Sequence, residues 1–230
     1  MFAAALLFFG CLSASAVPLK FLAWDESVAA RKLSVAYGKK SIDIGYMHPS
    51  ARTDPLAVPA DAENLRLVTR DRTDEKGRLL FVPLRIPAGV KKPLFLLMPD
   101  KKTKTGLRVL VFNDDPARFR WGTIRLLNFT GRPLVLRWGK KTVHLPNTTR
   151  PMTIAPGGKT RNVEVQLYLK DNSKRPLYSA LWEYRADMRQ IVFAVPNSDP
   201  ALGPVAFKFI SEHKDDAAAN AAKPQRSQNR

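Results

Sequence analysis

Histidine and cysteine are the side chains most often used to bind metals and to activate nucleophiles, and this chain offers few of them. Its three histidines are His48, His144 and His213, and no two of them have the close spacing of zinc ligands. No G-x-S-x-G nucleophile motif accompanies His48. The one cysteine, Cys11, lies in an apolar N-terminal segment that we expect to be removed. The sequence therefore predicts no metal site, no cofactor and no cysteine nucleophile.

Adjacent acidic residues are the next candidates for chemistry, and they occur at Asp25-Glu26, Asp114-Asp115 and Asp215-Asp216. Neighbouring side chains on a strand point to opposite faces, whereas the two carboxylates of a glycosidase face each other across the substrate. Turn or loop roles explain these pairs better, and we expect no enzymatic activity. The alternative is an enzyme that uses the Pro-rich segment 45–64, which carries His48 and Asp54.

Basic residues dominate the charge of the chain. Lysine and arginine number 38 against 20 acidic residues, which gives a net charge of +18 and favours anionic partners. The candidate ligand-binding residues lie in short basic clusters, one of which includes a tryptophan: Lys39, Lys40, Arg118, Arg120, Trp121, Lys140 and Lys141. The alternative is that lysines at turn tips protect the sheets from edge-to-edge association. The chain has no nucleic-acid-binding motif, so we expect no nucleic acid partner.

Two segments repeat one pattern around a Gly-Lys-Lys triplet: residues 33–44 align without gaps against residues 134–145. Glycine at the first central position of a two-residue turn favours a hairpin, which pairs Tyr37 with Lys40 and Trp138 with Lys141. Apolar residues then share one face of each hairpin, and a shift of one residue would destroy that separation. The repeat therefore predicts two hairpins in equivalent registers.

Further strand-like runs flank both hairpins, and two pairs of them match: residues 20–24 with 123–127, and 107–112 with 188–193. No long window has the apolar period of a helix, and turn residues separate the runs at intervals of about ten residues, as in sandwiches. We expect an all-β chain of two related antiparallel β-sandwich halves of immunoglobulin-like type.

The expected domain organisation follows from composition. We predict a signal peptide at 1–16, a first β-sandwich domain at 17–115 with a long loop at 45–64, a second at 116–210, and a disordered polar tail at 211–230. The signal peptide is indicated by the apolar run before Ala14-Ser15-Ala16, which has the small-x-small form of a cleavage site. That run is too short to span a bilayer, so we expect an exported protein without a transmembrane segment.

The stretch from Ile124 to Leu145, followed by the Ala155-Pro-Gly-Gly158 turn, resembles the opening of secreted bacterial β-sandwich domains of unknown function. The resemblance implies a fold and an envelope location, but no active site. In the first half, Trp24-Asp25-Glu26 stands where the second half has an Asn-Phe-Thr turn. Two tandem domains, a signal peptide and a basic charge also resemble periplasmic pilus chaperones.

These observations favour a non-enzymatic binding or scaffolding protein of the envelope, in the periplasm or at the surface of a Gram-negative-type bacterium. One alternative is a binder of an anionic envelope polymer, either a glycan or lipopolysaccharide, which would contact the basic hairpin tips. Another envelope protein is the other expected partner, and a periplasmic chaperone-like protein is the remaining alternative.

Overall fold

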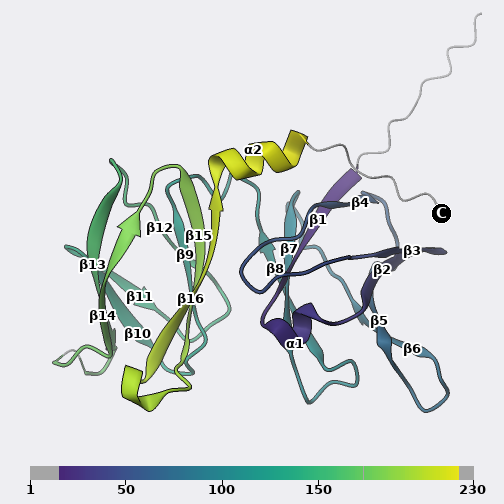
Figure 1. Cartoon of the computed structure of the whole chain (residues 1–230), viewed down its shortest axis with the longest axis horizontal. Helices are drawn as coiled ribbons and strands as arrows, with labels where there is room; N and C mark the ends of the chain where they lie inside the picture. The colour runs from purple at the N-terminus through teal and green to yellow at the C-terminus, as the bar shows by residue number, and fades with distance from the viewer. Residues whose placement is uncertain (1–15, 173, 223–230) are drawn as a thin grey trace, which may run out of the picture. The chain divides into compact units, whose positions relative to one another are not determined.

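The computed structural model describes residues 16–172 and 174–222 (Figure 1). These residues form two compact units. Unit 1 contains the chain up to Tyr46 together with Thr53–Phe112. Unit 2 contains Met47–Arg52 together with the chain from Asn113 onward. The predicted division at residue 115 did not include one feature: the segment Met47–Arg52 lies in the first half of the sequence but belongs to unit 2.

Unit 1 is built from eight strands and one short helix. In chain order they are β1 (Ala16–Ala23), α1 (Glu26–Ala29), β2 (Leu33–Tyr37), β3 (Lys40–Asp43), β4 (Leu56–Pro59), β5 (Arg66–Thr73), β6 (Leu79–Pro83), β7 (Pro93–Pro99) and β8 (Leu107–Asn113, whose last residue lies in unit 2). The acidic pair Asp25-Glu26 starts α1, where the Asp25 carboxylate accepts a hydrogen bond from the Val28 amide at 3.0 Å.

Unit 2 repeats the eight strands and adds a C-terminal helix. They are β9 (Ile124–Asn128), β10 (Leu134–Trp138), β11 (Lys141–Leu145), β12 (Met152–Ile154), β13 (Arg161–Leu169), β14 (Tyr178–Tyr184), β15 (Met188–Pro196), the 3-10 helix η1 (Pro200–Leu202), β16 (Val205–His213) and α2 (Lys214–Ala222). No helix among the described residues is both long and apolar enough to cross a membrane.

Each unit is a β-sandwich of two four-stranded sheets, and the strand order is the same in both. Unit 1 has the sheets β4-β1-β7-β8 and β3-β2-β5-β6, and unit 2 has β12-β9-β15-β16 and β11-β10-β13-β14. The pairs β1–β7 and β9–β15 are parallel, whereas the hairpins β2–β3, β5–β6, β10–β11, β13–β14 and β15–β16 are antiparallel. The expectation of an all-β chain with two related sandwich halves is confirmed, and the parallel pair is a feature that the sequence pattern did not indicate.

The two predicted hairpins have the predicted registers. Tyr37 pairs with Lys40, and Trp138 pairs with Lys141. Gly38 and Gly139 both have φ of 52°, which a residue with a Cβ adopts only with strain, so each turn requires glycine. The alternation of side chains then turns Leu134, Leu136 and Trp138 toward the interior of unit 2, where all three are buried.

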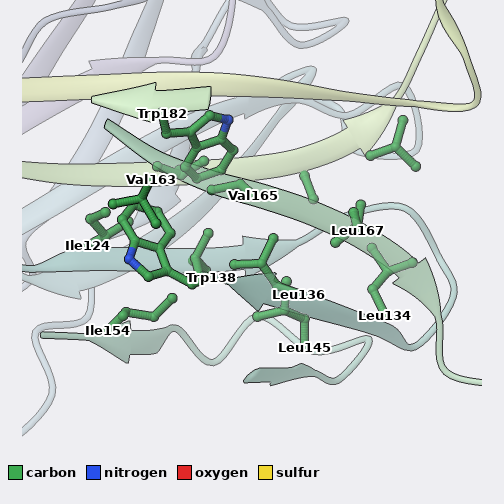
Figure 2. Close-up of a cluster of buried hydrophobic side chains, with 14 of the residues drawn as sticks. Ile124, Leu134, Leu136, Trp138, Leu145, Ile154, Val163, Val165, Leu167 and Trp182 are labelled. Atoms are coloured by element: carbon green, nitrogen blue, oxygen red, sulfur yellow. The ribbon is translucent and has the colours of Figure 1, made fainter. Parts of the chain in front are cut away.

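The core of unit 2 lies between its two sheets and is centred on two indole rings. Trp138 of β10 and Trp182 of β14 meet edge to face, with ring centroids 5.7 Å apart. Figure 2 shows both rings among branched aliphatic side chains that come from β9, β12 and β13. Trp138 was predicted to face the core, and this placement is confirmed.

Two other expectations differ from the structure. Residues 107–112 form β8, whereas the counterpart of the β15 segment 188–193 is β7, so that sequence match paired strands that are not equivalent. The predicted loop at 45–64 contains β4, which pairs with β1 as β12 pairs with β9. β4 was hard to recognise because it is short and ends at a proline. The wrong match of residues 107–112 arose because β8 and β15 are similarly apolar.

The chain ends also differ in part. We expected a disordered tail from residue 211, but residues 211–213 pair with β15 and Lys214–Ala222 is helical. β16 continues through residues 211–213 because residues 188–190 of β15 pair with them. Residues 223–230 and the predicted signal peptide lie outside the described residues, apart from Ala16, which begins β1.

A charged contact in unit 1 joins the segment after α1 to the second sheet. Arg31 pairs with Asp71 of β5, and its guanidinium nitrogens also donate to the Thr105 carbonyl oxygen at 3.3 Å. Burial raises the pKa of Asp71, but hydrogen bonds from Arg31 and from its own backbone amide outweigh that effect and lower it below 3.8. The pair therefore contributes stability while Asp71 is ionised.

Replacing Asp71 with asparagine is expected to lower the free energy of unfolding at pH 7 by roughly 0.5–1 kcal/mol, the range for partly exposed pairs. Because the pKa in the folded state lies below that of the unfolded chain, this contribution is present above pH 4 and is lost as the pH falls through the lowered value. Urea unfolding at pH 7 and at pH 3 measures it, with exposed Asp61→Asn as the control. A difference that stays constant down to pH 2 would contradict the assignment.

Candidate functional site

The predicted basic residues at the hairpin tips are exposed, and they fall in different units. Lys39 and Lys40 lie at the β2–β3 turn of unit 1, and Lys140 and Lys141 lie at the β10–β11 turn of unit 2. Each pair places two ammonium groups at the end of a hairpin. The structure therefore leaves all four side chains exposed and brings the lysines together only as two pairs, one in each unit.

The predicted cluster at residues 118–121 is split by the fold. Arg118 and Arg120 are exposed, whereas Phe119 between them is fully buried. Trp121 is half-buried and receives the guanidinium of Arg189 over its ring at 5.0 Å. Trp121 is thus engaged in an intramolecular contact and is only partly exposed, whereas Arg118 and Arg120 face the solvent.

The histidines do not come together with other possible ligands. His48 is exposed, and its Nδ1 accepts a hydrogen bond from the Ser50 amide at 3.0 Å. His144 is also exposed, on β11, and His213 ends β16. Within residues 16–172 and 174–222, no group of three or more His, Cys, Asp and Glu side chains could hold a metal ion.

Unit 2 contains a buried cluster of charges that sequence reasoning missed. We call it the arginine cluster, and it comprises Arg52, Asp114, Arg125, Arg189 and Glu212. The side chain of Arg189 is 2% exposed, that of Asp114 is 3% exposed and that of Arg52 is 4% exposed. Charged groups are rarely buried to this degree unless they are paired.

Asp114 is the centre of the arginine cluster. Its carboxylate accepts two hydrogen bonds from Arg52, at 3.0 and 3.1 Å, and one from Arg189 at 3.2 Å. Arg189 also donates to the Asp114 carbonyl oxygen at 2.8 Å and pairs with Glu212 on the neighbouring strand. The bidentate contact with Arg52 fixes the segment 47–52 against unit 2.

The third arginine of the cluster lies against an aromatic ring. The guanidinium of Arg125 stands over Phe119 at 4.0 Å from the ring centroid, and it donates to the Asn113 carbonyl oxygen. Burial lowers the pKa of Arg125 to about 10; Asp114 opposes this change, whereas Arg189 and Arg52 reinforce it. Arg125 therefore stays charged at neutral pH, and the cluster holds three cations against two carboxylates.

A second feature of unit 2 is open to solvent. We call it the aromatic groove: a hollow of about 580 Å³ between β14, the start of β15 and the end of β16. Its walls combine aromatic or aliphatic side chains with polar ones: Tyr178, Leu181, Trp182, Glu183, Arg185, Met188, Gln190, Phe209, Ser211 and His213. Apolar and hydrogen-bonding groups thus converge on one concave surface of unit 2.

Aromatic contacts keep the shape of this groove. The Trp182 indole nitrogen donates to the Tyr178 hydroxyl at 2.9 Å, and the Phe209 ring meets the indole edge to face at 4.8 Å. Phe209 is 36% exposed and Leu181 is 69% exposed, so both offer apolar surface to a ligand. Arg185 is paired with Asp187 at the end of the groove, which lowers the pKa of Asp187 through its hydrogen bond.

A scan against protein-family models finds no match for this chain, and a search of curated proteins finds none either. The fold and the side chains of each unit are therefore the basis for any functional proposal.

The charge balance of the arginine cluster makes a testable prediction. Replacing Asp114 with asparagine leaves three buried guanidinium groups with one carboxylate, and is expected to cost about 3–5 kcal/mol of stability. Replacing Arg125 with methionine balances the remaining charges, and is expected to cost at most about 1.5 kcal/mol for the lost hydrogen bond. Urea unfolding followed by tryptophan fluorescence compares the two variants. Equal losses for both would show that charge balance does not govern this cluster.

Proposed function

We propose that this chain is a non-enzymatic binding module of the bacterial cell envelope, and that the aromatic groove of unit 2 is its ligand site. The observation that carries the proposal is the concave surface on which Tyr178, Leu181 and Phe209 meet polar side chains at the open flank of a rigid sandwich. Ligand sites commonly combine apolar surface with polar groups that fix the orientation of the ligand, and this groove offers both.

The roles of the acidic side chains support binding rather than catalysis. Asp25 caps α1, and Asp114 is held by two buried arginines. Asp215 and Asp216 lie in the first turn of α2, where negative charge stabilises the helix. Each acidic pair that the sequence offered for chemistry thus includes a residue with a structural role.

Export to the envelope is supported by the sequence alone. The small-x-small site at Ala14-Ser15-Ala16 and the resemblance of residues 124–158 to secreted bacterial domains of immunoglobulin-like type both favour it. A chain that lacks cysteine after this site depends on its apolar core for stability, and the buried side chains of both units provide one.

Co-sedimentation of residues 17–230 with cell-wall and outer-membrane fractions over a salt series tests the groove. We expect binding that persists at high salt, because the groove offers shape and apolar contact rather than charge alone. Leu181→Arg places a bulky cation in the groove and should reduce binding at least about tenfold. The matched control is Leu202→Arg, since Leu202 is 74% exposed and lies outside the groove. Equal binding by both variants would refute the groove as the ligand site.

A second candidate function is supported by the exposed lysines at the hairpin tips, which favour an anionic polymer such as lipopolysaccharide. Changing Lys39, Lys40, Lys140 and Lys141 to glutamate should then abolish binding to lipopolysaccharide and leave the fold intact. The control variant changes Lys91, Lys92, Lys101 and Lys102, which are also exposed and alter the net charge equally. If the two variants lose the same affinity, the attraction depends on total charge and the hairpin tips are not a site.

A further inference from the structure

The strand order leaves the same two strands at the free edges of each unit. In unit 1, β6 ends one sheet and β8 ends the other, and β14 and β16 take these places in unit 2. An edge strand presents backbone N–H and C=O groups that no neighbouring strand binds. At the other two edges of each sandwich the chain itself passes from one sheet to the next, from β3 to β4 and from β11 to β12.

Each free flank also carries a hollow. In unit 1 a hollow of about 520 Å³ lies between β6 and the segment that leads into β8, and we call it the unit 1 groove. It is the counterpart of the aromatic groove, because β14 and β16 correspond to β6 and β8. Its recurrence in two units with different side chains indicates that the fold itself opens this flank.

The outward positions of β6 are apolar, which is unusual for an edge strand. Leu79 is 50% exposed and Phe81 is 49% exposed. Edge strands in soluble proteins are normally protected by charged residues or by proline. On β6 the proline comes only at the end, as Pro83, so the two apolar residues stand along an edge that can still pair.

The surroundings of the unit 1 groove are basic. Arg78 and Lys104 line it, the guanidinium of Arg66 lies 5.0 Å from the centroid of the Phe81 ring, and exposed Lys101 and Lys102 lie in the same loop as Lys104. The one carboxylate in the lining belongs to Asp74, which is paired with Arg78. A partner in this groove therefore meets an apolar floor and a positive rim.

We propose that β6 binds an extended, acidic polypeptide strand of another protein, which pairs with the free edge and places alternate apolar side chains in the unit 1 groove. Backbone pairing gives such a contact its affinity, and the alternation of side chains gives it specificity. A second copy of this chain fits poorly, because two copies that each carry +18 repel one another. The site is distinct from the aromatic groove, so either can exist without the other.

The probe is a synthetic peptide of alternating valine and glutamate, titrated into the whole chain while backbone amide signals and hydrogen exchange are followed. We expect slower exchange confined to residues 79–83 and to the groove residues 103–107. N-methylation of alternate peptide amides removes the donors that pair with β6 and should abolish binding. A peptide with lysine in place of glutamate should bind at least about tenfold more weakly.

The matching protein variant is Leu79→Ser with Phe81→Ser, which removes exposed apolar surface and leaves the core unchanged. It should lose at least about tenfold in affinity for the peptide, whereas Leu202→Ser should lose none. Binding that survives N-methylation or the double substitution would reduce the contact to charge attraction and overturn the proposal. No binding at about 1 mM peptide would overturn it as well. Self-association that the double substitution abolishes would identify a second copy as the occupant and also overturn it.

Discussion

The parallel pairing of the first strand with the seventh closes each sandwich, and the rest of the architecture depends on it. Parallel neighbours cannot be joined by a tight hairpin, and the chain forms all four strands of the other sheet before β7 returns to β1 and β15 to β9. The eighth strand (β8 or β16) then lies at the outer edge of the sheet that contains the parallel pair. The sixth strand (β6 or β14) lies at the edge of the other sheet. The open flank and both grooves follow from this order.

The arginine cluster shows how unit 2 buries charged side chains on the outer face of a sheet, a face that is exposed to solvent in a simple sandwich. Arg125 and Arg189 lie on the face of their sheet opposite the core residues Leu126 and Val192. Their burial requires carboxylates, and Asp114 supplies one from the segment before β9. The cluster is best understood as structural, since Asp114 and Glu212 pair with the guanidinium groups of Arg52 and Arg189 inside the unit, whereas the aromatic groove faces the solvent.

Local patterns in the sequence predicted local structure well. The Gly-Lys-Lys repeat determines both hairpins because a two-residue turn and the alternation of side chains fix a register without distant contacts. The arginine cluster and the grooves depend on residues far apart in the chain, such as Arg52 and Arg189, whose proximity no spacing encodes. One signal was present: Arg125 and Arg189 each interrupt an apolar strand, where a cation needs a buried partner. Helix α2 has no apolar stripe, so its sequence resembled that of a tail.

The excursion of residues 47–52 has a consequence for the order in which the protein is made. After β3 the chain passes from unit 1 into unit 2 at Met47, and it re-enters unit 1 after Arg52, before β4. This segment is synthesised well before Asp114 and Glu212 exist to receive Arg52. On the ribosome Arg52 therefore lacks its main carboxylate partner until Asp114, the residue after β8, has been made. A gene fragment that ends before Asp114 leaves Arg52 without the carboxylate that binds it, so unit 2 depends on residues from both halves of the sequence.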